Sequence, residues 1–379
     1  MSDAAPSTAD ADQPVQSGLQ TRFPCKGCGA QLAYAPGTTS LVCPYCKFDN
    51  PISVEGAAVV ELDFLAALDE LQDRGETADK LVSHCDSCGA NVTFPADVTS
   101  CACPFCGRDV VAARASTKMI KPHGVLPFGL NERAARDAYR KWLNGLWFAP
   151  SSLKQFANLD AGLTGTYLPY WTYDCDADTR YSGMRGDDYW VTESYTATVN
   201  GRPTVRTRQV RKTRWTPVAG RVHNAFNDVL VCASGSVGET RAGALEPWDL
   251  SKVAGYADEY LAGFRSESYA VNLKDGFVVA QAKMEPEIVA TINSNIGGDH
   301  QRITSKDSQY SRMTYKHLLL PVWTSAYRYK GKVYSILVNA RTGEVIGERP
   351  WSAWKITGLV IAILLAVLAV VLVIKLSGN

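Results

Sequence analysis

Two copies of one cysteine spacing constrain the fold of this chain more than any other feature of its sequence. Each copy reads C-x₂-C, fourteen residues, C-x₂-C, and the second copy begins 60 residues after the first. This spacing is typical of a zinc ribbon, in which two tight cysteine turns close one tetrahedral site of four thiolates. The first set is Cys25, Cys28, Cys43 and Cys46, and the second set is Cys85, Cys88, Cys103 and Cys106.

The ligand type favours zinc, although four thiolates also suit a rubredoxin-like iron centre. We expect two structural Zn²⁺ ions, because a closed shell of four ligands leaves no open position for catalysis. Alternating apolar residues predict a β-hairpin between the two cysteine pairs of each copy, formed in the first copy by Gln31–Tyr34 and Ser40–Val42. Units this small bury too little apolar surface to fold alone, so metal binding would supply most of their folding free energy.

The remaining three of the 11 cysteines, Cys101, Cys175 and Cys232, are expected to be small apolar residues without a ligand role. The segment from Met1 to Leu19 contains no apolar signal sequence. Many cysteines without an export signal indicate a reducing compartment, and metal ligands rather than disulfides.

The uncharged segment Ile356–Ile374 predicts one membrane-spanning helix within residues 355–375. Its 19 residues rise about 1.5 Å each and cover roughly 28 Å, close to the thickness of the hydrocarbon core. Trp351, Trp354 and Lys355 before it, and Lys375 after it, are residue types that anchor helix ends at a membrane interface. Residues 376–379 form a short tail, so we expect a tail-anchored protein with the lipid bilayer as one partner.

Basic residues beside this segment predict its orientation. Arg341, Arg349 and Lys355 precede the span, whereas Lys375 alone follows it. The positive-inside tendency then places the residues before the span in the cytoplasm, where the cysteines also stay reduced. We expect a single-pass protein of the cytoplasmic membrane with its N-terminal domains in the cytoplasm.

The overall composition is that of a globular chain. Hydrophobic residues make up 46%, charged residues 20%, and the net charge is +1, which excludes a mainly disordered or uniformly basic protein. The expected fold class is two small Cys₄ β-hairpin modules, an α+β domain with an antiparallel sheet, and one C-terminal transmembrane helix. The expected divisions are a disordered tail over 1–20, a first zinc ribbon over 21–54, a helical linker over 55–80, a second ribbon over 81–115 and the α+β domain over 116–350.

Periodic apolar residues predict helices in the linker and in the large domain. The linker helix is Glu61–Arg74, and the others are 131–146, 250–264 and Gly276–Asn295, the last interrupted or kinked near Pro286. Asn131 and Asp249 are the expected caps of the two helices that follow them. Strand-like segments are Tyr167–Asp178, Tyr189–Val199, Thr204–Val218, Asn227–Ala233, Leu318–Tyr329 and Lys332–Asn339.

One strand-like segment carries a stripe of basic side chains that could bind an anionic partner. In a strand these residues share one face and could hold nucleic-acid phosphates or anionic lipid headgroups. The alternative is a solvated face that forms a cross-strand ion ladder with acids on a neighbouring strand. The basic residues are Arg206, Arg208, Lys212 and Arg214, and the acids proposed as their partners are Asp174, Asp176 and Asp178.

Motifs of the common enzyme classes are absent from the sequence. It contains no G-x₄-G-K-[ST], no G-x-G-x-x-G after a strand, no H-E-x-x-H and no G-x-S-x-G. The five histidines are scattered along the chain and form no cluster in the sequence. The sequence therefore predicts no catalytic residues, no small-molecule substrate and no enzymatic activity.

The pattern as a whole resembles a bacterial family of membrane-anchored proteins with tandem transcription-factor-IIB-type zinc ribbons. Members are often labelled primosomal protein N′ (replication factor Y) or superfamily II helicase-like. The resemblance implies architecture rather than an activity, and a helicase motor is excluded because the sequence has no P-loop. Besides both cysteine sets it rests on KPHGVLPFGL (Lys121–Leu130), LWFAP (Leu146–Pro150), LPYWTYD (Leu168–Asp174), DVLVCAS (Asp228–Ser234), PWDL (Pro247–Leu250), IGGDHQRI (Ile296–Ile303), KHLLLPVW (Lys316–Trp323) and ERPWSAWK (Glu348–Lys355).

Three functions follow from these features as hypotheses, the third of which is an unrecognised enzyme in the large domain. The first is a non-enzymatic, zinc-stabilised scaffold or adaptor that binds protein partners at the cytoplasmic face of the membrane. The second is a membrane-tethered nucleic-acid-binding protein that uses the ribbons and the basic segment Arg202–Arg221.

Overall fold

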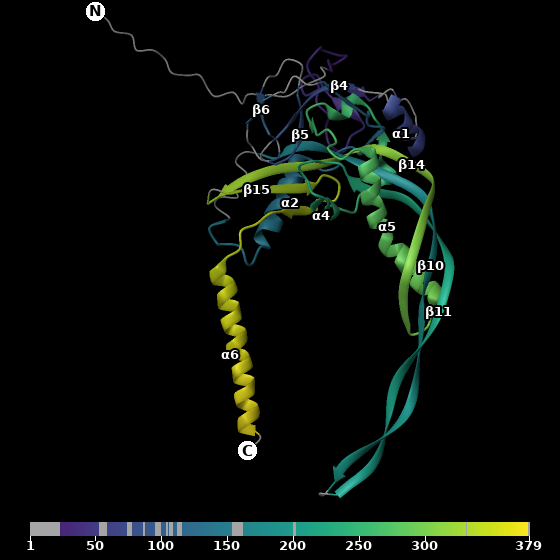
Figure 1. Ribbon diagram of the computed structural model, residues 1–379. Helices are drawn as coiled ribbons and strands as arrows, with labels where there is room; N and C mark the ends of the chain where they lie inside the picture. The colour runs from purple at the N-terminus through teal and green to yellow at the C-terminus, as the bar shows by residue number, and fades with distance from the viewer. Residues whose placement is uncertain are drawn as a thin grey trace, which may run out of the picture.

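A long antiparallel sheet forms the body of the computed structural model (Figure 1). The structure describes residues 23–52, 59–73, 78–85, 88–94, 100–103, 105, 109–111, 116–153, 162–199, 202–330 and 332–377. Two extensions leave the body in the same general direction, one a β-hairpin and the other the C-terminal helix. Residues 1–20, the expected disordered tail, and residues 378 and 379 lie outside the described residues.

The main path of the sheet has the strand order β11-β10-β14-β15-β16, with antiparallel neighbours throughout. These strands are β10 (Thr164–Val199), β11 (Arg202–Cys232), β14 (His300–Tyr329), β15 (Lys332–Asn339) and β16 (Val345–Gly347). Short strands pair along this path: β3 (Leu62–Asp63) and β9 (Gly124–Val125) with β14, β12 (Ala254–Gly255) with β9, and β13 (Arg265–Ser266) with β10. A sheet-rich domain is therefore present, as the sequence predicts.

Helix α5 (Leu273–Ile296) packs along β10 and β11 and buries one face against them. Asn272 caps this helix, because its side chain accepts a hydrogen bond from the N–H of Asp275. The helix continues through Pro286, so the expected interruption there is wrong. Helix α2 (Glu132–Asn144) is capped in the same way by Asn131, as the sequence predicts. Helix α1 (Phe64–Asp73), within the predicted linker helix, begins where Asp63 Oδ1 accepts from the N–H of Ala66.

The expected helix over 250–264 is wrong. The structure has two short 3₁₀ turns here, Leu250–Lys252 and Asp258–Leu261, separated by strand β12. Asp249 accepts from its neighbour Ser251 and does not cap a helix. The apolar spacing of the segment fits a helix, but β9 offers its backbone groups to β12, and a pairing partner more than a hundred residues away cannot be seen in a local pattern.

The small modules that carry the cysteines use short two- and three-stranded sheets. The first pairs β1 (Ser40–Val42) with β2 (Asp49–Pro51). The second has one sheet of β5 (Asn91–Phe94), β4 (Ala78–His84) and β8 (Ser116–Met119), and another of β6 (Ser100–Ala102) and β7 (Asp109–Val111).

The predicted hairpin between the two cysteine pairs of each copy is wrong. Strand β1 pairs with β2 across the turn that holds Cys43 and Cys46, so the cysteine turn is itself the hairpin loop. The first pair lies in an equivalent place, because Pro24 bridges Gln31 around Cys25 and Cys28. Each tight cysteine turn thus brings its own two flanking segments together, which a count of intervening residues does not reveal.

Candidate metal centres

The four sulfur atoms of the first cysteine set lie together, all within 4.8 Å of one another. Cys25 Sγ is 3.5 Å from Cys46 Sγ, and Cys28 Sγ is 3.6 Å from Cys43 Sγ. A tetrahedral zinc ion with Zn–S bonds of about 2.3 Å requires sulfur–sulfur separations of about 3.8 Å. The residues therefore fit one Zn²⁺ ion, and they would hold it as a closed S₄ site.

The second cluster consists of Cys85, Cys88 and Cys103, whose sulfur atoms also lie within 4.8 Å of one another. Cys88 Sγ is 3.6 Å from Cys103 Sγ, the same separation as in the first cluster. Cys106, the fourth expected ligand, lies outside the described residues. The two clusters can form two zinc sites.

The backbone of each cysteine turn is held in a tight conformation that brings the sulfur atoms together. The N–H of Gly29 donates to the carbonyl of Cys25, and Gly89 donates in the same way to Cys85, both at 2.8 Å. Both glycines have positive φ, a conformation that costs glycine little. Lys47 repeats this turn at φ 60°, with its N–H 3.1 Å from the carbonyl of Cys43, so the fold imposes the left-handed turn even on a residue with a side chain.

The buried side chain of Asn50 forms hydrogen bonds to both cysteine turns of the first cluster. Asn50 Oδ1 accepts from the N–H of Lys26 at 3.0 Å, and its Nδ2 donates to the carbonyls of Leu41 and Phe48, both at 3.1 Å. The same Nδ2 lies 3.8 Å from Cys25 Sγ. Asn50 thereby fixes both cysteine turns relative to each other, the kind of outer contact that orients metal ligands.

The pKa values of Cys25 and Cys46 indicate that the thiols of the first cluster need a cation in order to ionise together. Burial opposes ionisation of Cys25, but hydrogen bonds from the backbone of Gly27 and Cys28 outweigh it, and the pKa of Cys25 falls to about 6. A hydrogen bond from Phe48 lowers the pKa of Cys46, but the neighbouring thiols Cys28 and Cys25 raise it to about 12. Four thiolates cannot ionise together without a positive charge between them, and a divalent ion at the centre supplies it.

Both clusters are packed into the body. Cys25 and Cys43 share one apolar core with body residues, and the ring of Tyr34 in the first module lies 5.3 Å from that of Tyr260. Cys85 and Cys103 share a second core with strands of the main sheet. Whatever ions these thiols hold would thus be fixed to the sheet and would act as structural elements.

Cys175 and Cys232, which were expected to have no role as metal ligands, are buried thiols, as predicted. Burial raises the pKa of Cys175 to about 11 and that of Cys232 to about 12. Neither thiol is poised to act as a nucleophile, because the reactive form is the thiolate. The side chain of Cys101 lies outside the described part of the structure.

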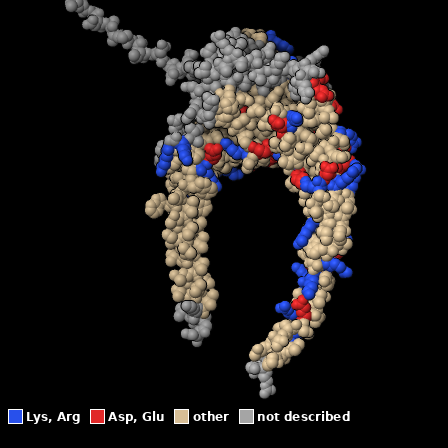
Figure 2. Space-filling model, viewed as in Figure 1, with Lys and Arg blue, Asp and Glu red and all other residues tan. Residues whose placement is uncertain are grey.

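The predicted basic stripe lies on a two-stranded arm (Figure 2). β10 and β14 pair as far as Gly186 and His300, and beyond this point β10 and β11 continue alone to the pair Val199 and Arg202. The register of β10 and β11 is unbroken over this arm, so its stripe lies on one face. The residues of the stripe, all exposed, are Arg206, Arg208, Lys212 and Arg214.

The expected ion ladder between this stripe and Asp174, Asp176 and Asp178 is wrong. The register places Asp178 opposite His223, far along the sheet from the stripe, and Asp178 pairs with Arg221 at 3.2 Å. A ladder does form, but with a different acid. Glu193 pairs with Lys212 at 2.8 Å and with Arg208 at 3.6 Å.

Two arginines of the stripe, Arg206 and Arg214, have no ion pair within the part of the chain that the structure describes. The guanidinium of Arg214 lies over the ring of Tyr189, 5.7 Å from its centroid. This arrangement keeps the cation exposed while it packs on an aromatic face. About half of the stripe is therefore free to meet an anionic partner.

Glu61, Asp174 and Asp228 surround Lys316 on β14, a charge cluster that the sequence did not predict. Lys316 Nζ is 2.7 Å from Asp228 Oδ1, 3.1 Å from Glu61 Oε1 and 3.8 Å from Asp174 Oδ2. Burial lowers the pKa of Lys316, but hydrogen bonds to Asp228 and Glu61 outweigh it and leave the pKa raised. The hydrogen bond from Lys316 lowers the pKa of Glu61, whereas burial raises that of the deeper Asp174.

Helix α6 (Ala353–Ser377) is long and apolar enough to cross a membrane, by length and composition. An 18-residue window within its segment Ala353–Leu372 has a mean hydropathy of 2.8, and none of that window is buried in the protein. The helix is tied to the body at its start, where Lys355 Nζ donates to the carbonyls of Trp147 and Ala149. Trp147, whose carbonyl accepts from Lys355, is exposed like Trp354 at the start of α6, and the sequence did not predict Trp147 at this junction.

Comparisons with known proteins give one relative. The chain is 24% identical over 329 residues to the uncharacterized protein YdjG of Bacillus subtilis (strain 168), an alignment that covers 72% of this chain and 91% of that protein. No family model matches the chain, and no solved structure matches it.

Proposed function

We propose that this protein is a membrane-anchored adaptor in which two Zn²⁺ ions stabilise two zinc ribbons. The sulfur clusters, with their tetrahedral spacing, support the metal assignment. Helix α6 serves as the anchor, and the positive-inside tendency favours a tail-anchored protein with its N-terminal domains in the cytoplasm. The tandem ribbons and the flanking motifs resemble the membrane-anchored family named above, which supports the same architecture.

An exposed aromatic pair beside the first cluster carries the adaptor proposal. Tyr45, within the second cysteine turn, is 79% exposed, and Phe48, just after it, is 47% exposed. The turn beneath these rings is held by Cys43 and Cys46, so the rings are presented on a rigid support. Exposed aromatic side chains on rigid elements are the usual anchors of protein–protein interfaces. The adaptor acts by binding and needs no catalytic group.

Affinity capture of the full-length protein from membranes tests this proposal. We expect a stoichiometric protein partner that Tyr45→Ser removes, because the variant deletes the most exposed ring without touching a cysteine. Tyr195→Ser is the matched control, since it removes an exposed ring from the arm. Loss of the partner with Tyr45→Ser alone supports the adaptor. A capture that is empty, or unchanged by Tyr45→Ser, contradicts it.

The free cations of the arm favour a second candidate, a membrane-tethered nucleic-acid-binding protein. The measurement is the affinity of full-length protein, in nanodiscs of neutral lipid, for DNA and RNA across a range of salt. Binding to phosphates should weaken steeply with salt, with a slope of about −0.9 per phosphate contacted on duplex DNA. Replacing Arg206, Arg208 and Arg214 with alanine should reduce that slope. No binding at low salt, or an unchanged slope in the variant, rules this candidate out.

A further inference from the structure

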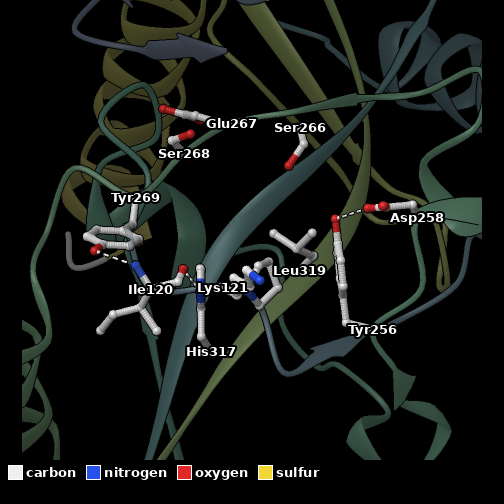
Figure 3. Close-up of a pocket in the computed structure, with 11 residues that line it drawn as sticks. Ile120, Lys121, Tyr256, Asp258, Ser266, Glu267, Ser268, Tyr269, His317 and Leu319 are labelled. Carbon is white, nitrogen blue, oxygen red and sulfur yellow. Dashed lines mark hydrogen bonds between the residues drawn. The ribbon is translucent and has the colours of Figure 1, made fainter. Parts of the chain in front are cut away.

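A cavity of about 350 Å³ lies in the body, outside the metal centres and the arm (Figure 3). Its walls come from the segment that precedes β9, from the turns after β12, from β13 with the residues that follow it, and from β14. Small-molecule sites in proteins usually enclose about 300–1,000 Å³. The cavity therefore suits a compact ligand.

Aromatic and aliphatic side chains make up most of the lining surface. Figure 3 shows the rings of Tyr256 and Tyr269 on opposite sides, with Leu319 and His317 between them. The His317 ring is held in place, since it lies 4.6 Å from the ring of Trp171 and 5.5 Å from that of Tyr269. Aromatic rings on two sides and an aliphatic side chain between them fit an aromatic group.

The acids of the lining are already engaged. The carboxylate of Glu267 accepts hydrogen bonds from the hydroxyls of Ser234 and Ser236, at 2.7 and 2.8 Å, and from the N–H groups of Gly235 and Ser236, at 3.0 and 3.2 Å. Asp258 Oδ1 accepts from the hydroxyl of Tyr256 at 2.6 Å. These carboxylates hold the walls together, and a ligand cation would have to displace those bonds.

The ammonium of Lys121 and the hydroxyl of Ser266 belong to the lining, and neither forms a hydrogen bond with the residues that the structure describes. Figure 3 shows the Ser266 hydroxyl directed into the space between the rings. A cation and a hydroxyl donor without partners select for an anion, and a carboxylate accepts from both.

The cavity wall is fixed before any ligand enters. The N–H of Ile120 donates to the Tyr269 hydroxyl at 3.0 Å, and the N–H of Ser268 donates to the carbonyl of Asn91 at 3.3 Å. Asn91 Nδ2 donates in turn to the carbonyl of Tyr269 at 3.4 Å. Strand β5 of the second cysteine module thus braces one wall, which reduces the ordering cost of binding.

We propose that this cavity binds a small aromatic carboxylate. The flat ring lies between Tyr256 and Tyr269, above Leu319, and the carboxylate accepts hydrogen bonds from Lys121 and Ser266. The charge selects the acid over its neutral analogues.

The test uses full-length protein in nanodiscs of neutral lipid, titrated calorimetrically with naphthalene-2-carboxylate, with empty nanodiscs as the blank. We expect saturable one-to-one binding, and binding of naphthalene-2-carboxamide weaker by about tenfold or more, because hydrogen bonds to a charged group are the stronger kind. Lys121→Ala should weaken the binding of the carboxylate by a similar factor and leave the affinity for the carboxamide unchanged. Lys252→Ala is the control, since this exposed lysine lies outside the cavity lining.

Three results would overturn the proposal. They are the absence of saturable binding of the acid at millimolar concentration, equal affinity for acid and amide, and equal effects of Lys121→Ala and Lys252→Ala. Lys121 is exposed, so its truncation should leave the fold intact, and an unchanged circular dichroism spectrum verifies this.

Discussion

Replacing Lys316 with methionine tests how the charge cluster on β14 holds the linker segment to the sheet. The side chain of Lys316 is only 11% exposed, and it contacts Glu61, Asp174 and Asp228. Methionine keeps most of the side-chain volume and removes the charge. Three carboxylates would then face one another without a cation, two on the sheet and one just before β3.

The expected loss follows from the burial of the partners. Removing one member of a buried ion pair costs about 3–5 kcal/mol, because a charge is left uncompensated in a poorly solvated place. Glu61 is 43% exposed and Asp228 is 30% exposed, so water screens both and the lower end of that range applies. We expect Lys316→Met to reduce the free energy of unfolding by about 3 kcal/mol, which lowers the melting temperature of a body of this size by about 6–12 °C.

The stability lost in Lys316→Met should decrease as the pH falls. Lys316 keeps the folded pKa of Glu61 below its unfolded value, so its stabilising effect is present above that unfolded value and is lost as the pH falls through the folded one. Without Lys316 the carboxylates protonate more readily. The difference between the wild-type protein and the variant should therefore be large at pH 7 and shrink toward pH 4.

The assay is thermal unfolding of full-length protein in detergent, followed by circular dichroism at pH 7 and at pH 4.5. Lys306→Met is the matched control, because Lys306 pairs with Glu285 where both side chains are about a third exposed. Exposed pairs contribute about 0–1 kcal/mol, so the control should shift the melting temperature by only a few degrees. Equal shifts in the two variants, or a Lys316→Met difference that does not shrink at pH 4.5, would refute the reasoning.

Three further predictions concern the metal sites, the core and the anchor. Purified protein should contain two zinc ions per chain by elemental analysis, and Cys28→Ser should reduce this to about one, because the cluster that contains Cys85 has separate ligands. Gly276→Ala should lower the melting temperature by several degrees, since its new Cβ would lie 2.3 Å from the Tyr173 hydroxyl, which donates to the carbonyl of Leu273. Leu364→Arg should shift the protein from the membrane fraction to the soluble fraction, because a central arginine costs about 2.5–3.5 kcal/mol on insertion, whereas Leu364→Ile should have no effect.

Local patterns predicted the parts of this structure that depend on neighbouring residues. The cysteine clusters follow from spacing, helix α2 follows from its cap and periodicity, and helix α5 follows from periodicity alone. The predicted strand segments overlap strands of the structure, but those strands are longer: Thr204–Val218 and Asn227–Ala233 fall on the single strand β11, and β14 begins at His300, well before Leu318. The predicted segments Tyr167–Asp178 and Tyr189–Val199 are likewise one strand of 36 residues. Gly183 and Gly186 lie in the interval between the two, and glycine usually weakens a strand.

Close approach to the neighbouring strand explains these glycines. A Cβ on Gly183 would lie 2.4 Å from the carbonyl oxygen of Arg302 on β14. The contact depends on a residue more than a hundred positions away, so no local pattern reveals it. The charge cluster at Lys316 and the cavity escaped prediction for the same reason, since each is assembled from segments that are distant in the chain.

The arm and helix α6 make opposite demands on their surroundings. Beyond Gly186 the arm is only two strands wide, so its outer rims carry backbone groups that need water as a partner. Both extensions leave the body on the same side (Figure 1). Only α6 forms all of its backbone hydrogen bonds internally, as a segment in the hydrocarbon core of a bilayer must. If α6 enters a bilayer, the arm cannot follow it to the same depth. The arm must then stay in water while the helix lies in the hydrocarbon core.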